Sequence, residues 1–258
     1  MPGASRYLLG MPHFQTFDGR SLFYDDQGEG DTVLLLHGFV GDINIDWIRS
    51  GILDRLLDEG YRVVAVDARG HGLSDKPHEL AAYENDAVTK DAVALLDELD
   101  IDRCMVVGFS MGARTALHLA VIDRRVRAVV ALGLGEHSLR HNERGIGLVP
   151  DAMLTDDPDA IEQESIRHFR EMADAIHADR EALASFMAAP RTEVPDIVDQ
   201  VAVPVLVVTG SDDVTAGDPN PLADRLQQGK AVQTAGDHPG VKDQPITHDS
   251  IVEFLSSV

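Results

Sequence analysis

The sequence predicts an α/β protein built on a doubly wound, mostly parallel sheet. Short apolar, β-branched runs alternate along the chain with longer segments whose apolar residues recur every three or four positions. Most runs are apolar almost without interruption, as expected of parallel strands that helices cover on both faces. With 258 residues, of which 44% are hydrophobic, the chain is long enough to bury one full core.

The predicted elements begin with two weaker β segments near residues 13–17 and 21–26. Asp18-Gly19 joins them, which predicts an antiparallel hairpin at an edge of the sheet. The apolar runs that follow are predicted to be buried strands. They are Thr32–His37, Tyr61–Asp67, Arg103–Gly108, Val126–Leu132 and Val203–Thr209.

Helical spacing separates these strands. We predict helices over residues 84–99 and 111–122, and a final helix from Ile246 to Leu255. A helix that follows each strand is the pattern that places successive strands parallel in one sheet. The second helix starts directly after the third apolar run, so the chain must turn sharply there.

The alternation breaks between residues 135 and 200, where the composition becomes polar and helical. Asp157-Pro158 predicts a helix start, because proline favours the first helical position. We interpret residues 135–200 as a helical cap inserted into a sheet domain of residues 1–134 and 201–258. The apolar residues of its two helices are expected mainly to make packing contacts. They are Ile166, Phe169, Met172, Ala173 and Ile176 in the first helix, and Leu183, Phe186 and Met187 in the second.

Charge and composition limit the expected partners and location. The formal net charge is −22, which disfavours nucleic acid, an anionic membrane surface and polyanionic substrates. The single cysteine, Cys104, lies in an apolar run and is expected to be a buried thiol. We find no stretch with the length of a membrane span and no signal-peptide pattern near Met1. These features favour a cytoplasmic protein without a membrane partner, and they leave the oligomeric state open.

The segment Gly108-Phe109-Ser110-Met111-Gly112 matches the pattern G-x-S-x-G between a buried strand and a helix. On such a sharp strand-to-helix turn the serine is held in a strained conformation with its hydroxyl exposed. The flanking glycines allow the strand and the helix to approach closely. The sequence therefore predicts Ser110 as a catalytic nucleophile.

A serine hydroxyl becomes a good nucleophile when a histidine takes its proton and a carboxylate orients that histidine. On a G-x-S-x-G turn of this kind the chain order is serine, then Asp or Glu, then histidine. Gly210-Ser211-Asp212-Asp213 follows the last major strand, and Gly236-Asp237-His238 follows the next one. The order fits, with Asp212 or Asp213 as the acid and His238 as the base.

With these motifs the chain resembles the α/β-hydrolase superfamily, in its serine-nucleophile branch, over nearly its whole length. The resemblance implies an eight-stranded, mostly parallel sheet with an inserted helical cap. It also favours Asp213 over Asp212, and His238 over His248 in the final helix. The motifs that carry it are His37-Gly38-Phe39, Asp67 to Asp75, the Ser110 turn, Pro204 to Gly210 and His238.

The oxyanion of an acyl-transfer reaction needs two backbone N–H donors. The residue after the nucleophile supplies one, which here is Met111. The resemblance implies Phe39, directly after His37-Gly38, as the other. His37 and His71 are expected to fix loop geometry, and Trp47 to line either the pocket or the core.

The sequence predicts neither a metal nor an organic cofactor. His137 and His141 are four residues apart, but no third ligand with suitable spacing accompanies them. The glycines around His71 are not a dinucleotide fingerprint, because the G-x-G-x-x-G turn after the first strand of a βαβ unit is absent.

The identity of the residue at the nucleophile position limits the reactions that the site is expected to catalyse. Related dehalogenases and epoxide hydrolases use an aspartate at this turn, whereas this chain has Ser110. We therefore predict a cofactor-free carboxylic ester hydrolase that acts on a small molecule through an acyl-enzyme. A perhydrolase, a lactonase, a carbon–carbon bond hydrolase or a lyase on the same residues remain alternatives. A non-catalytic small-ligand receptor of the same fold is another.

Overall fold

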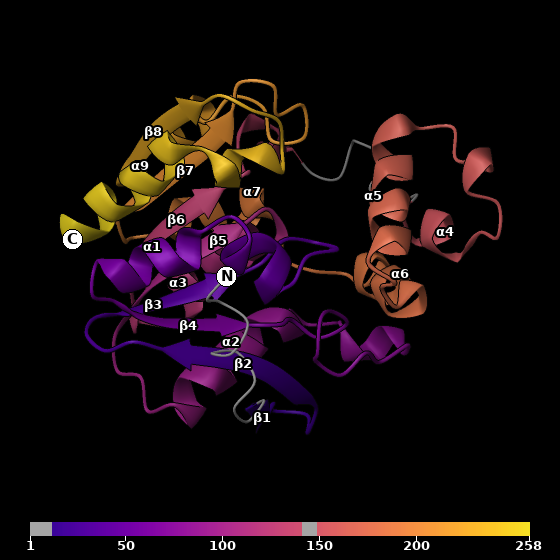
Figure 1. The fold of residues 1–258 in the computed structure, drawn as a ribbon, viewed down its shortest axis with the longest axis horizontal. Helices are drawn as coiled ribbons and strands as arrows, with labels where there is room; N and C mark the ends of the chain where they lie inside the picture. The colour runs from indigo at the N-terminus through magenta and orange to yellow at the C-terminus, as the bar shows by residue number, and fades with distance from the viewer. Residues whose placement is uncertain (1–11, 141–148) are drawn as a thin grey trace, which may run out of the picture.

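The computed structural model describes residues 12–140 and 149–258, with one central sheet covered by helices (Figure 1). The sheet order is β1-β2-β4-β3-β5-β6-β7-β8. Its strands are β1 (His13–Gln15), β2 (Ser21–Gln27), β3 (Thr32–Leu36), β4 (Arg62–Val66), β5 (Cys104–Phe109), β6 (Val126–Leu132), β7 (Val205–Gly210) and β8 (Gly229–Thr234). β1 pairs with β2, and β2 with β4, antiparallel, whereas every neighbouring pair from β4 to β8 is parallel. The predicted eight-stranded, mostly parallel sheet is confirmed.

The described helices follow the strands as the alternation predicted. They are α1 (Ile52–Asp58), α2 (Ala87–Glu98), α3 (Met111–Ile122), α4 (Val149–Leu154), α5 (Glu164–Ala175), α6 (Arg180–Ala188), α7 (Val194–Ile197), α8 (Asn220–Arg225) and α9 (Pro245–Ser256). Helix α2 starts three residues later than predicted, because Asn85 and Asp86 both have a φ of 55° and interrupt the right-handed helix. Within the described ranges, no helix is both long and apolar enough to cross a membrane.

The core lies on both faces of the sheet, because successive strand residues point to opposite sides. Val33 and Leu35 of β3 pack with α1 and α9, whereas Leu34 and Leu36 pack with α2 and α3. All five residues of β3 are buried, which explains why this strand is apolar without interruption. This two-sided packing holds the carboxyl ends of the parallel strands in place, and the candidate site forms there.

Helices α4, α5 and α6 stand together to one side of the sheet (Figure 1). They share a small core of their own that includes Met153, Ile166 and Leu183. A helical turn does start at Pro158, and the Asp157 side chain caps it by accepting the N–H of Asp159. This 3₁₀ turn ends at Ala160 and does not continue into the long cap helix, because Ile161 is extended and α5 begins at Glu164.

Both ends of the proposed cap segment are attached to the sheet domain. Val194 and Ile197 of α7 belong to the core around α3. On the other side, the backbone N–H groups of Glu136 and His137 donate to carbonyls in the loop after β7. We therefore propose that the part of the segment that covers the site lies between these anchors, on α4, α5 and α6.

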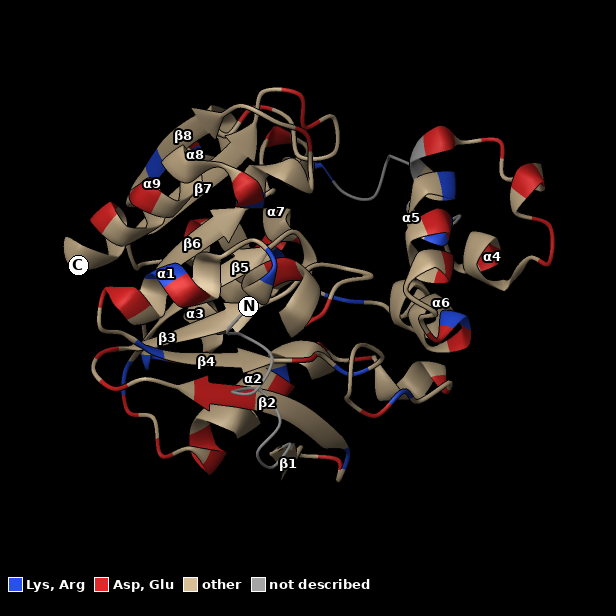
Figure 2. Ribbon diagram, viewed as in Figure 1, with Lys and Arg blue, Asp and Glu red and all other residues tan. Residues whose placement is uncertain are grey.

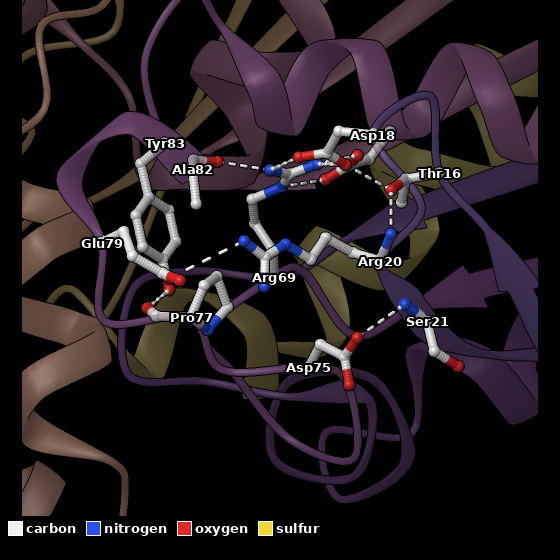
Figure 3. A network of polar contacts seen from close by, with 11 residues as sticks. Thr16, Asp18, Arg20, Ser21, Arg69, Asp75, Pro77, Glu79, Ala82 and Tyr83 are labelled. Atoms are coloured by element: carbon white, nitrogen blue, oxygen red, sulfur yellow. Dashed lines mark hydrogen bonds and ion pairs between the residues drawn. The ribbon is translucent and has the colours of Figure 1, made fainter.

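A buried arginine network fastens the β1–β2 hairpin to the loop after β4 (Figure 3). Arg69 is fully buried and donates twice to Asp91, at 2.6 Å each, and twice to Asp18, at 3.0 Å each. A further bond reaches the carbonyl of Ala82. Burial raises the pKa of Asp91 to about 6, although Arg69 acts to lower it. The ionised Asp91 is therefore tolerated because Arg69 is beside it.

Replacing Arg69 with methionine is expected to lower the free energy of unfolding by about 3–5 kcal/mol at pH 8, because it leaves a buried carboxylate without its counter-charge. Loss of Arg69 moves the pKa of Asp91 further above its unfolded value. Ionised Asp91 then destabilises the fold at any pH above the pKa that Asp91 has in the unfolded chain. The loss of unfolding free energy relative to the wild type therefore shrinks as the pH falls toward 5. Urea unfolding at both pH values measures the effect.

Arg62→Met is the matched control for this experiment. Arg62 makes a similar two-fold contact to Asp26, at 2.9 and 2.7 Å, but both side chains are about a quarter exposed. An exposed pair of this kind contributes up to about 1 kcal/mol. Equal losses for the two variants, or a loss for Arg69→Met that does not depend on pH, would contradict the account given for Asp91.

Candidate active site

Ser110 lies on the turn between β5 and α3, in the strained conformation that the sequence predicted. Its φ is 51° and its ψ is −107°, and its backbone N–H donates to the Leu132 carbonyl at 2.8 Å. A Cβ on Gly112 would lie 1.8 Å from the carbonyl oxygen of Leu36, and one on Gly108 would lie 2.3 Å from that of Gly112. The motif therefore needs both glycines, because the helix packs directly against the backbone of the neighbouring strand.

The structure brings the predicted acid and base to Ser110. His238 Nε2 lies 3.0 Å from Ser110 Oγ, and His238 Nδ1 lies 2.8 and 3.0 Å from the two carboxylate oxygens of Asp213. The Asp213 carboxylate also accepts the backbone N–H groups of Thr215 and Ala216, at 3.0 and 2.8 Å. These two bonds fix the carboxylate, which in turn orients the imidazole.

The alternative acid and base lie elsewhere. Asp212 is exposed and is contacted by the Ser211 hydroxyl. His248 lies on α9, where its Nε2 is 2.7 Å from the carbonyl oxygen of Lys242. The geometry favours Asp213 and His238 over these two neighbours.

Phe39 and Met111 line the same cavity as Ser110. Met111 is the first residue of α3, so its N–H has no partner within the helix. Among the described residues, neither this N–H nor that of Phe39 donates a hydrogen bond. Two free donors beside the nucleophile suit the predicted oxyanion role, which stays a prediction.

A buried ion pair behind the site was not predicted from the sequence. Lys242 Nζ donates to Asp46 Oδ1, and Asp46 Oδ2 accepts the N–H of Gly38 at 2.7 Å. The same Lys242 Nζ lies 4.0 Å from the centroid of the Phe109 ring. The pair thus connects the loop that carries His238 with the Gly38 loop and the strand end before Ser110. Since its members are 196 positions apart in the sequence, no local pattern marks it.

A cavity of about 250 Å³ opens beside Ser110. The expectation that the cap stripe serves mainly for packing holds for Ile166 and Leu183, which are buried in the cap core. Phe169, Phe186 and Met187 also pack in apolar clusters, as expected. In addition, these three side chains line the cavity.

Two other predicted histidines have structural positions. His37 Nε2 accepts the N–H of Ala68 at 2.9 Å, and its Nδ1 donates to the Gly38 carbonyl at 2.8 Å. Burial lowers the pKa of His71 to about 3, so this ring is neutral at physiological pH. Both residues hold loops around the site, as predicted. Trp47 is fully buried in the sheet core and does not line the cavity.

His137 lines the cavity, but His141 lies outside the described residues. In residues 12–140 and 149–258, no three His, Cys, Asp or Glu side chains gather as a metal site would require. Cys104 is buried, and burial raises its thiol pKa to about 12, so it is un-ionised at physiological pH.

The eight-stranded, mostly parallel sheet agrees with a comparison of the sequence with known families. A sequence profile described as the alpha/beta hydrolase fold matches residues 31–223, most of the chain. The chain belongs to the α/β-hydrolase fold family. The resemblance inferred from the motifs is thereby confirmed, and the matched region contains both Ser110 and Asp213.

Relatives within the α/β-hydrolase family differ in their named activities. A non-heme chloroperoxidase of Streptomyces lividans is 28% identical over 230 residues, which are 77% of this chain and 80% of that protein. An epoxide hydrolase of Caballeronia sordidicola is 34% identical over 151 residues, which are 55% of this chain and 45% of that protein. Against three curated relatives, the matched region spans 31% to 45% of their own length.

The fold is shared with solved structures at low sequence identity. An esterase of Exiguobacterium antarcticum superimposes with a TM-score of 0.77 at 19% identity, over 95% of this chain and 98% of that one. At this identity the likeness supports the α/β-hydrolase fold and leaves the reaction to be argued from the site.

Proposed function

We propose that this α/β-hydrolase is a carboxylic ester hydrolase that works through an acyl-enzyme on Ser110. The observation that carries the proposal is the continuous contact from Ser110 Oγ to His238 Nε2, at 3.0 Å, and from His238 Nδ1 to Asp213, at 2.8 Å. Each link is within hydrogen-bond range, so a proton can pass from the serine to the imidazole without rearrangement.

In the proposed reaction His238 takes the Ser110 proton while Ser110 Oγ attacks the ester carbonyl carbon. The N–H groups of Phe39 and Met111 hold the negative oxygen that results. His238 then gives its proton to the departing alcohol oxygen, which leaves an acyl group on Ser110. Water attacks that acyl group by the same route and releases the acid. Asp213 stabilises the charged imidazole in both halves.

Epoxide opening fits this site less well, although an epoxide hydrolase is among the relatives. A carboxylate nucleophile that opens an epoxide forms an ester, whose carbonyl water can attack. Ser110 would form an ether, which offers no carbonyl carbon and no oxyanion for Phe39 and Met111 to hold. The serine at this turn therefore favours acyl substrates.

The direct test is turnover of 4-nitrophenyl acetate, butyrate and octanoate, followed through release of 4-nitrophenolate. We expect hydrolysis, with acetate and butyrate preferred, because a cavity of about 250 Å³ is small for a long acyl chain. A fluorophosphonate probe should add once, at Ser110, as intact mass and peptide mapping would show. If all three esters stay intact and the probe does not react, the chain is better described as a receptor of this fold.

Perhydrolysis is a second candidate, favoured by the match to the non-heme chloroperoxidase over 77% of this chain. The acyl-enzyme would be the same, but hydrogen peroxide in place of water would attack it and release a peracid. Adding peroxide to the butyrate assay and measuring peracid against butyrate separates the two outcomes. A peracid yield no higher than the uncatalysed one would leave hydrolysis alone.

A further inference from the structure

The cavity beside Ser110 differs in charge from the rest of the chain. The whole protein carries a net charge of −22, and Figure 2 shows acidic positions spread over its loops and helices. Yet the described residues that line the cavity include three arginines, Arg114, Arg140 and Arg191, and one carboxylate, Glu193. A net charge describes the outer surface and the long-range field, so it does not decide which ligand a small cavity prefers.

Arg114 is fixed close to the nucleophile. It lies on α3 one turn after Ser110, whose carbonyl accepts the Arg114 backbone N–H at 3.1 Å. Its guanidinium donates to the Thr192 carbonyl at 2.6 Å and lies 3.9 Å from Asp86. Burial, and then the charge of Arg191, lower the pKa of Arg114 to about 10. The two guanidinium groups are therefore near enough to repel each other.

The Arg191 guanidinium makes weaker polar contacts than that of Arg114. Its guanidinium lies over the Phe186 ring, 5.3 Å from the centroid, and reaches the Phe186 carbonyl at 3.4 Å and Met187 Sδ at 3.6 Å. These contacts are long for hydrogen bonds. Within the described part of the chain, no carboxylate oxygen lies within 4.0 Å of it. A guanidinium has five N–H donors, so most of those on Arg191 are unused.

We propose that Arg191, with Arg114, binds a carboxylate of the substrate, so that the preferred ester carries an anionic group. A carboxylate accepts two parallel N–H bonds from a guanidinium, and its charge offsets the repulsion between the two arginines. The surrounding Phe169, Phe186 and Met187 suit a short apolar chain between the ester and the carboxylate. That the ligand is an ester cleaved at Ser110 rests on the proposed function. The binding of a carboxylate by the two arginines does not depend on it.

Two pairs of matched esters locate the carboxylate. Mono-4-nitrophenyl adipate against 4-nitrophenyl hexanoate tests the acyl side, and 4-acetoxybenzoate against 4-acetoxybenzamide tests the leaving group. In at least one pair we expect kcat/KM to favour the charged ester. Arg191→Gln should lower the ratio of charged to neutral kcat/KM by roughly 10- to 100-fold, as loss of charge-assisted hydrogen bonds does. Arg191→Lys, which keeps the charge, should restore part of it.

Arg180→Gln is the control, because it removes the same charge from α6, at a side chain that is 34% exposed and does not line the cavity. The ratio of charged to neutral kcat/KM of Arg180→Gln should stay within about twofold of the wild-type ratio. A charged-to-neutral ratio that is the same in the wild type, Arg191→Gln and Arg180→Gln, for both ester pairs, would overturn the proposal.

A binding measurement separates this proposal from the proposed reaction and needs no variant to fold. Hexanoate and hexanamide share the chain length and differ in charge, so calorimetry on the wild-type protein isolates the contribution of the carboxylate. We expect hexanoate to bind at least tenfold more tightly, even if no ester is turned over. Equal affinities, or no hexanoate binding, would refute the anion site while leaving the ester hydrolase proposal in place.

Discussion

Ser110→Ala is expected to lower kcat for 4-nitrophenyl acetate by about 10⁶-fold, the loss typical of removing a serine nucleophile from such a triad. The variant keeps His238, Asp213 and both proposed oxyanion donors. However, it has no oxygen 3.0 Å from His238 Nε2 to attack the carbonyl. Residual turnover of roughly 10³–10⁴ over water would come from the oxyanion donors and binding alone. Initial rates at saturating ester, with the uncatalysed rate subtracted, give the measurement.

The variant is expected to fold, because alanine removes only the hydroxyl and retains the Ser110 backbone bond to Leu132. Ser211→Ala is the matched control, since that serine is exposed and its hydroxyl contacts Asp212 rather than the site. It should retain wild-type kcat. If Ser110→Ala kept more than a hundredth of the wild-type rate, Ser110 would not be the nucleophile.

Much of the fold could be predicted because its signals are local. A parallel strand that is buried on both faces, such as β3, must be apolar at every position. Likewise, the turn at Ser110 needs glycine where a Cβ would meet the backbone of another element, as at Gly112. Each requirement acts on a few consecutive residues and can therefore be recognised in the sequence. The helix starts were less accurate, because the positive φ of Asn85 and the extended Ile161 have no comparable signature.

The rest of the site depends on contacts between distant segments. Lys242 pairs with Asp46, 196 positions away in the sequence, and the charge of Arg191 acts on Arg114, 77 positions before it. Neither pair follows from spacing. The net charge averages over 258 residues, so the expectation that polyanionic substrates are disfavoured describes the outer surface. It gives no information on the three arginines that line the cavity, on which the proposed carboxylate site depends.

Asp213→Asn is expected to lower kcat by about 10⁴-fold while the fold is retained. The Asp213 oxygen that accepts the N–H groups of Thr215 and Ala216 has a counterpart in the asparagine carbonyl. The other oxygen, 2.8 Å from His238 Nδ1, becomes an NH₂ group, which is a donor. His238 must then turn an unprotonated Nδ1 toward it and carry its proton on Nε2. In that tautomer it cannot accept the Ser110 proton.

Asp212→Asn makes the same chemical change at the neighbouring exposed carboxylate, so it removes the same charge without touching His238. It should change kcat by less than about twofold, because an exposed carboxylate has no fixed contact with the imidazole. Rates for both variants at saturating 4-nitrophenyl acetate, with unfolding midpoints measured alongside, complete the test. A large loss for Asp212→Asn with a small one for Asp213→Asn would exchange the roles of the two residues. Comparable losses in both would indicate a general effect of charge rather than control of the imidazole tautomer.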